Sequence, residues 1–97
     1  MPAQMVQSED GKLSVEGSVT IHNVVAMVEQ GIALFDRNNL TIDLTRVTEV
    51  DSSAVSMLLE WQREARRRNC RLHFANTPQN LKGLAQLYGV FEFVSLA

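Results

Sequence analysis

The chain has 97 residues, of which 45% are hydrophobic and 21% are charged, and its formal net charge is −2. This length suits one domain with one modest core, and the near-neutral charge leaves no electrostatic footprint for nucleic acid or anionic lipid. A single cysteine excludes an internal disulfide framework, and no apolar run approaches the ~20 residues that span a bilayer. We therefore expect one cytoplasmic domain, residues 1–97, without a signal peptide.

The start of the chain predicts a short strand. Residues 1–10 are polar and show no periodicity, so we expect them to be flexible. Residues 12–16 alternate polar and apolar side chains, which is typical of a strand with one buried face. Gly17 interrupts this pattern, and residues 18–21 are expected to form a second strand or a bend.

A helix is predicted over residues 23–37, where apolar residues recur at helical spacing. Asn23 suits its N-cap, because the side-chain oxygen can accept a bond from an unpaired backbone N–H. Gly31 is expected to weaken this helix. Residues 40–44, Leu-Thr-Ile-Asp-Leu, then predict a short central strand, and residues 45–50 predict a loop.

A second helix and a further strand follow. Asp51 and Ser52 begin a helix that runs to about Asn69, and residues 71–75 predict a strand. Strands separated by helices favour right-handed crossovers and a largely parallel sheet, to which the early strands add an antiparallel edge. The sequence therefore predicts an α/β fold.

A third helix is predicted from Thr77 to Tyr88. Thr77 is expected as its N-cap, with Pro78 at the first helical position, where a missing N–H does no harm. Gly89 is expected to end the helix. Residues 90–94 are mostly apolar and predict a last short strand or a turn.

Residues capable of catalysis or metal binding form no recognisable arrangement. His22 and His73 have no further ligands at zinc-binding spacing. Cys70 has no evident base beside it and is interpreted as a structural thiol. Asp43 and Asp51 match no known acid–base pair, and no glycine-rich phosphate loop is present. We therefore expect no catalytic residue, no metal site and no cofactor.

The end of the second helix carries a basic run made of Arg63, Arg66, Arg67 and Arg68. Cations in the last turn of a helix complement its dipole and its unpaired carbonyls. The run has no interleaved aromatic residues, and Glu60 and Glu64 offset it. We interpret it as structural and expect no nucleic-acid partner.

The most informative segment is residues 42–59, where a strand, a short connection and a helix start follow one another. Asp51 and Ser52 are typical N-cap residues, worth about 1 kcal/mol. The segment also resembles the STAS family (sulfate transporter and anti-sigma factor antagonist), in which a Val/Ile-x-Asp-Leu strand precedes Asp-Ser-Ser/Thr-Gly-Leu. Here the two parts read Asp43-Leu44 and Val50-Asp51-Ser52-Ser53-Ala54-Val55.

This resemblance covers nearly the whole chain and implies the STAS fold, a mixed, mostly parallel sheet of four to five strands packed by three to four helices. It also implies a docking function without catalysis. In the anti-sigma factor antagonists of the family, a partner kinase phosphorylates the serine that corresponds to Ser52. Ala54 stands where the family commonly has glycine, and its extra methyl group alters how closely a kinase can approach.

A second part of the chain resembles one branch of this family. Residues 84–90, Leu-Ala-Gln-Leu-Tyr-Gly-Val, are similar to the ending of the STAS subunit in bacterial phospholipid-transport ABC systems of the Mla type, which maintain outer-membrane lipid asymmetry. This branch implies the transporter ATPase as partner and a cytoplasmic position, bound to the inner membrane only through the complex. The alternative is an anti-sigma factor antagonist, whose partner is the anti-sigma factor and serine kinase.

The apolar residues of the second helix cover an arc of roughly 200°, about twice the ~100° that a helix lying on one sheet needs. Either neighbouring helices cover the excess, or Met57 and Trp61 extend an exposed contact patch beside the helix start. The partner-binding residues expected on this second interpretation are Asp51, Ser52, Ser53, Ala54, Met57 and Trp61.

Overall fold

The computed structural model of the chain describes residues 3–8, 12–35, 38–92 and 94, which form a four-stranded sheet and three helices. The strands are β1 (Gln4–Gln7), β2 (Leu13–Val19), β3 (Asn39–Val50) and β4 (Arg71–Ala75). The helices are α1 (Val24–Ile32), α2 (Ser52–Arg67) and α3 (Gln79–Leu87). The predicted α/β fold with a mixed, mostly parallel sheet is confirmed.

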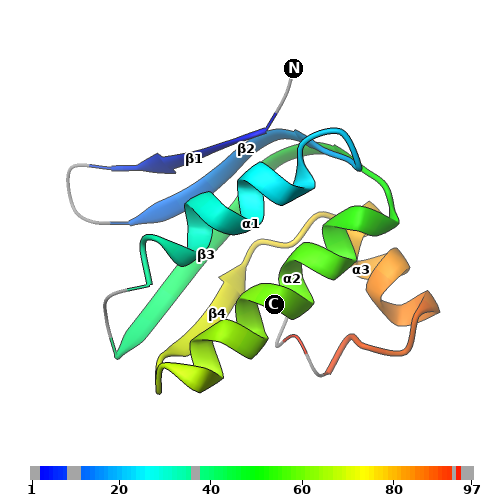
Figure 1. Cartoon of the computed structure of the whole chain (residues 1–97). Coiled ribbons are helices and arrows are strands. Elements are labelled where there is room, and N and C mark those ends of the chain that lie inside the picture. Colours follow the sequence, from blue (N-terminus) through cyan, green and yellow to red (C-terminus); the bar gives the residue numbers. More distant parts are fainter. Residues whose placement is uncertain (1–2, 9–11, 36–37, 93, 95–97) are drawn as a thin grey trace.

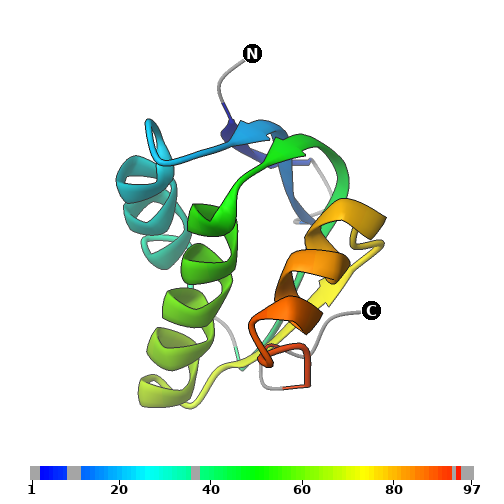
Figure 2. The same ribbon diagram turned by 90° about the vertical axis from the view of Figure 1, so that its right-hand side faces the viewer.

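The sheet has the order β1-β2-β3-β4, in which β1 pairs antiparallel with β2 and the other pairs are parallel. α1 and α2 lie side by side on one face of the sheet, and α3 lies on the other flank of α2 (Figures 1 and 2). α2 is thus enclosed by the sheet and by one helix on each side. Because Val19 pairs with Val50, the starts of α1 and α2 follow strand ends at the same edge of the sheet.

β3 is 12 residues long and includes residues 45–50, which we expected to form a loop. Its register against β2 shifts twice, with one extra β3 residue each time, near Arg46 and just before Val50. Such β-bulges break the alternation of inward and outward side chains. The buried residues Leu44 and Val47 are therefore three positions apart instead of two, and this spacing hid the strand.

The start of the chain differs from expectation, whereas its end agrees with one of two expected alternatives. Residues 4–7 form β1, so the prediction of a flexible start is wrong there, because pairing with β2 orders these residues. β2 continues through Gly17, whose φ of 97° is readily adopted by glycine. Residues 91–92 and 94 lie in turns, which is one of the two alternatives expected for this segment, and residue 93 lies outside the described residues.

Asn23 stands at the N-cap position of α1 as expected, but its side chain makes no cap bond, and Thr77 does not cap α3. The Asn23 side chain turns back onto the preceding residues, since its Oδ1 accepts from Thr20 N at 3.1 Å and its Nδ2 donates to Ser18 O at 2.8 Å. α3 has Pro78 at its N-cap and no side-chain cap bond. Thr77 lies one position too early and is buried.

Trp61 lies in the centre of the core with 0% of its surface exposed. Its ring stacks on Phe74 and meets Phe35 edge-on, at centroid separations of 6.3 and 6.4 Å. Its Nε1 donates to the Val28 carbonyl of α1 at 3.1 Å. A Cβ on Gly31 would lie only 2.4 Å from Trp61 Cε2. The glycine that we expected merely to weaken α1 is the residue that lets α1 approach α2 this closely.

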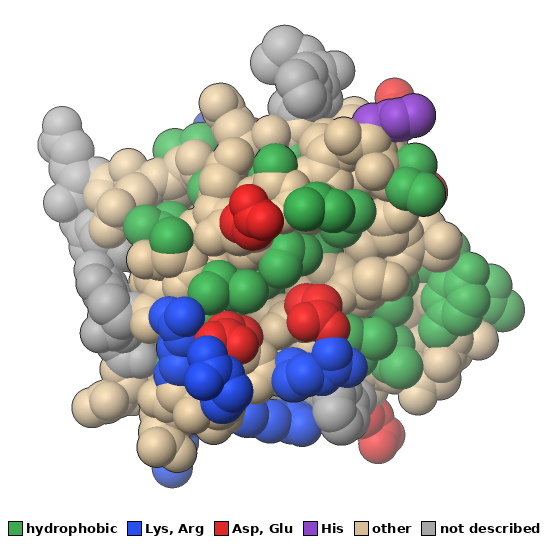
Figure 3. Space-filling model, viewed as in Figure 1, with side chains coloured by type: hydrophobic (Ala, Val, Ile, Leu, Met, Phe, Trp, Pro, Cys, Tyr) green, Lys and Arg blue, Asp and Glu red, His purple; other side chains and the backbone are tan. Residues whose placement is uncertain are grey.

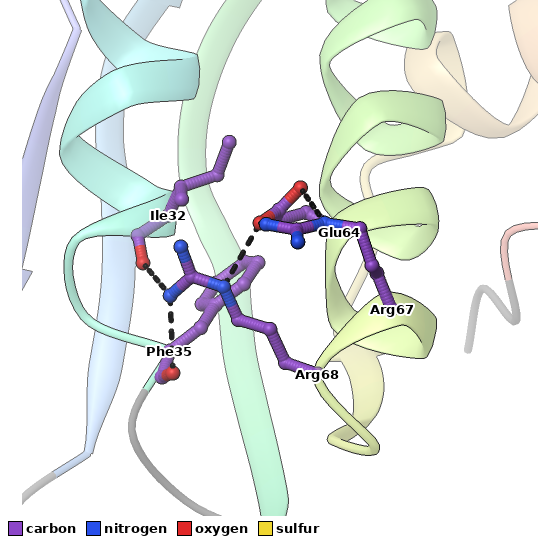
Figure 4. Close-up of polar contacts among 5 residues, drawn as sticks. All are labelled: Ile32, Phe35, Glu64, Arg67 and Arg68. Carbon is purple, nitrogen blue, oxygen red and sulfur yellow. Dashed lines mark hydrogen bonds and ion pairs between the residues drawn. The ribbon is translucent and has the colours of Figure 1, made fainter.

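The basic run at the end of α2 joins two helices (Figure 4). Arg68 Nη1 donates to the carbonyls of Ile32 and Phe35 at 3.2 and 3.5 Å, and its Nε donates to Glu64 at 2.9 Å. Hydrogen bonds from Arg67 and then from Arg68 hold the pKa of the Glu64 carboxyl below its usual value. This part of the run therefore bonds the carbonyl of the last residue of α1 and that of Phe35 just beyond the helix, in agreement with the structural interpretation.

Candidate protein-docking site

The candidate site begins at Asp51, between the end of β3 and the start of α2. Asp51 Oδ1 accepts a bond from Ser53 N at 2.8 Å, so Asp51 is the N-cap that the sequence predicts. Its other carboxylate oxygen, Oδ2, accepts from Ile21 N at 3.0 Å. One side chain therefore holds the start of α2 against the turn between β2 and α1, with Ser52 as the first helical residue.

These hydrogen bonds lower the pKa of Asp51. The Ile21 N–H makes the largest contribution, the Ser53 backbone and hydroxyl add to it, and the nearby His22 contributes least. A carboxyl with a lowered pKa in the folded state stabilises the fold fully above its unfolded pKa of about 3.9. This stabilisation is lost as the pH falls through the folded pKa.

We expect Asp51→Asn to make the stability of the fold less dependent on pH in the acid range. Because the amide does not titrate, the variant should lose less stability than the wild type between about pH 5 and pH 2. Urea midpoints measured across this range would test the difference. Asp43 and Glu64 also have lowered pKa values, so some acid dependence should remain in the variant. If the urea midpoints of the variant and the wild type depended on pH in the same way, Asp51 would have the same pKa in the folded and unfolded states.

Ser52 is exposed and borders a groove of about 410 Å³ between α2 and the segment that ends α3. We call it the Ser52 groove, and it is lined by Ser52, Val55, Ser56, Leu59, Tyr88 and Val90. Tyr88 is 55% exposed and the adjacent Leu87 is 77% exposed. Apolar walls with hydroxyl groups among them are typical of a surface that binds another protein.

The structure exposes only part of the predicted partner-binding set. Ser52 is exposed, and Asp51 and Ser53 are partly buried. Ala54, Met57 and Trp61 are at most 1% exposed, so the predicted contact patch around Met57 and Trp61 is wrong. α1 and α3 flank α2 and cover the part of its apolar arc that does not face the sheet. This is the other interpretation that the sequence allowed.

Sequence reasoning missed the exposed apolar residues on either side of α2. Leu87 and Tyr88 end α3, and Ile21 and Val25 lie at the start of α1. A signal was present in the adjacent apolar pairs. Neighbouring helical residues lie about 100° apart, so in a helix that packs along one face only, one residue of the pair Val24 and Val25 is expected to lie outside the buried face.

Other residues singled out from the sequence do not join this site. Within the described residues, no three His, Cys, Asp or Glu side chains gather as a metal site. Asp43 accepts from Thr45 N at 2.8 Å and from Asn76 Nδ2 at 3.4 Å, partners different from those of Asp51. Cys70 is buried and His73 is exposed. None of the described helices is both long enough and apolar enough to cross a bilayer.

A family profile described as "Mlab, STAS domain" matches residues 3–95. The chain belongs to this STAS family. The STAS domain is similar to the solved structure of the unphosphorylated form of the anti-sigma factor antagonist SpoIIAA, with a TM-score of 0.73 and 17% identity over 99% of this chain and 88% of that one. No curated protein matches the sequence significantly. The STAS domain is a protein-interaction domain of a generally non-catalytic, regulatory class.

Proposed function

We propose that this STAS domain is a non-catalytic cytoplasmic subunit that binds and supports the ATPase of a phospholipid-transport ABC complex, which maintains outer-membrane lipid asymmetry. The observation that carries the proposal is the family match, whose description is Mlab, over residues 3–95. The Leu-Tyr-Gly sequence at the end of α3 is the part of the chain that resembles the STAS subunits of that transporter branch. Its tyrosine, Tyr88, lines the Ser52 groove. The protein reaches the inner membrane only through its partner.

The contacts at the Ser52 groove support docking. Ser52 and Ser56 stand one helical turn apart on the open side of α2, with Leu59 and Tyr88 forming apolar walls. Apolar walls supply area whose burial favours association, and the hydroxyls supply hydrogen bonds that fix orientation. The Asp51 bonds to Ile21 and Ser53 keep this surface ordered before the partner arrives. We infer that the ATPase covers the groove and the start of α2.

We expect Ser52→Glu to weaken binding to the ATPase at least about tenfold, because it places an uncompensated charge inside a desolvated contact. The fold should remain intact, since an acidic residue in the first turn is favourable to the helix dipole. The phospholipid-transporter ATPase of the native bacterium would be purified, and binding measured by titration calorimetry. Ser52→Ala separates the effect of charge from the loss of the hydroxyl.

Ser8→Glu is the matched control, because it makes the same substitution at an exposed serine beside the opposite edge of the sheet. It should bind like the wild type. Equal binding by Ser52→Glu and Ser8→Glu would remove the Ser52 groove from the contact. Failure of the wild-type chain to bind the ATPase, or its copurification with a serine kinase and without transporter subunits, would refute the proposed function.

A second candidate function is that of an anti-sigma factor antagonist switched by phosphorylation of Ser52. Two observations favour it: Ser52 is exposed, and the fold is similar to that of SpoIIAA. A phosphate at this helix start would be tolerated by the dipole while changing the docking surface by its charge. Incubation with the cognate kinase and ATP should then add one phosphate, which Ser52→Ala abolishes. A chain that is never modified in cells would rule this candidate out.

A further inference from the structure

A second apolar groove lies on the other side of α2, between α2 and α1. It has a volume of about 310 Å³ and is lined by Val24, Val25, Val28, Glu29, Ser56, Met57 and Glu60. We call it the α1–α2 groove. Hydrophobic side chains gather over α1 and α2 with acidic side chains on both sides of them (Figure 3). Val25 is 67% exposed, and Ile21, one turn before it, is 69% exposed.

The position of this groove continues the candidate site. Ser56 lines both grooves, so the α1–α2 groove and the Ser52 groove meet along the open side of α2. A partner that covers the start of α2 is therefore within reach of both. Two apolar surfaces on either side of the exposed residues Ser52 and Ser56 would give the partner more area to bury than the Ser52 groove alone.

The residues that line the groove limit which class of ligand can occupy it. Its side walls are helices, so it offers no strand edge for β-augmentation, and no aromatic side chain lines it, as a polyproline ligand would need. A volume of about 310 Å³ lies at the lower limit for small-molecule sites. The two glutamates on its rim repel anionic lipids and nucleic acids. The remaining recognition mode is a helix laid into a groove.

The charges of the rim also define the helix that would fit. Glu29 comes from α1 and Glu60 from α2, so each wall carries one carboxylate. Glu60 pairs with Arg63, whereas Glu29 has no ion-pair partner among the described residues. An incoming helix with a lysine or arginine facing Glu29 would therefore gain a complementary charge at the rim. The nine residues of α1 span about 13 Å, which matches two to three turns of such a helix.

We propose that the α1–α2 groove binds an amphipathic helix of the partner protein, with apolar residues spaced i, i+3 or i+4, and i+7 and with lysine or arginine beside them. This inference rests on the proposed function for the presence of a protein partner. It adds a second contact, separate from Ser52, and states the chemistry of the element that fills it. The apolar residues of the helix contact Val24, Val25 and Val28, which are the lining residues of α1 that are apolar and not buried.

Photo-crosslinking tests the occupant directly. Val25 is replaced by p-benzoylphenylalanine, the chain is mixed with the purified ATPase and irradiated, and the linked peptide is identified by mass spectrometry. The expected product is a peptide of the ATPase that has the helical apolar spacing and flanking basic residues. A link to an acidic or extended segment, a link between two copies of this chain, or no link from a complex that has formed would each overturn the inference.

Binding variants separate the groove from the Ser52 contact. Val25→Asp should weaken ATPase binding at least about tenfold. The protein should remain folded, because an acidic residue in the first turn of α1 is favourable to the helix dipole. Glu29→Gln should slow association and reduce its salt dependence. Its control is Gln30→Lys, which makes the same change in net charge at an adjacent exposed position outside the groove.

The pattern of results distinguishes the two proposals. If the wild type does not bind the ATPase at all, the proposed function fails and this inference fails with it. If Ser52→Glu weakens binding while Val25→Asp binds normally, the proposed function stands and the inference is wrong. If Gln30→Lys slows association as much as Glu29→Gln, the effect belongs to overall charge and the basic flank of the helix is refuted.

Discussion

Gly31→Ala is expected to destabilise the fold by about 2–3 kcal/mol, in the range for overpacked cores, which lowers the melting temperature by roughly 10–20 °C in a domain of this size. The added Cβ would lie 2.4 Å from Trp61 Cε2 and 2.5 Å from its Nε1. Trp61 has no free space to retreat into, because Phe35 and Phe74 contact it on other sides. Thermal and urea unfolding followed by circular dichroism would measure the loss.

Gly83→Ala is the matched control for this prediction. Gly83 lies inside α3, and a Cβ there would meet nothing within 4 Å. Alanine loses less conformational freedom than glycine in a helix, so this variant should gain about 0.5–1 kcal/mol. The same substitution should therefore have opposite signs in α1 and α3. A destabilisation of similar size at both positions would contradict the close approach of Gly31 to the indole.

Trp61→Ala is expected to cost about 3–5 kcal/mol, a large part of the stability of a small domain. The substitution removes the ring that Phe35 and Phe74 pack against and leaves a cavity between α1, α2 and the sheet. Trp61→Phe keeps most of the apolar volume and loses the hydrogen bond to Val28, so its loss should be smaller, about 1–2 kcal/mol. Denaturant titration of all three proteins would measure this order.

The same variants test whether Trp61 has any part in docking. Trp61→Phe should bind the ATPase as the wild type does under conditions where both are folded, because the indole is fully buried. Gly31→Ala combined with Trp61→Phe should destabilise less than the sum of the two, since the indole atoms that the new Cβ meets are removed. A Trp61→Phe protein of unchanged stability that binds more weakly would restore Trp61 to the contact surface.

Long periodic segments were predictable from the sequence. α2, β4 and α3 occur within about two residues of their expected bounds, and Gly89, with a φ of 71°, follows α3 as expected. In these segments the apolar spacing and the turn residues agree. β1 was not predictable, because Gln4-Met5-Val6-Gln7 holds only two apolar residues and is ordered by pairing with β2.

The candidate site was predictable in its location but not in its extent. The Asp51 cap and the exposed Ser52 follow from local helix chemistry, which a sequence states directly. Whether Trp61 faces solvent depends on where α1 and α3 lie, and that is a tertiary property. The bond from Ile21 to Asp51 joins residues 30 positions apart, and local patterns carry no information about such a contact.

The short strand β1 has a consequence for the behaviour of the protein in solution. β2 is seven residues long and contains the buried residues Leu13, Val15 and Val19. Without β1, its backbone amides and carbonyls would form an open sheet edge, which is a template for aggregation and domain swapping. β1 covers four of these residues and presents exposed glutamines, Gln4 and Gln7, at its ends. The segment that was expected to be flexible therefore replaces a seven-residue edge strand by a four-residue one, which offers a shorter template for self-association.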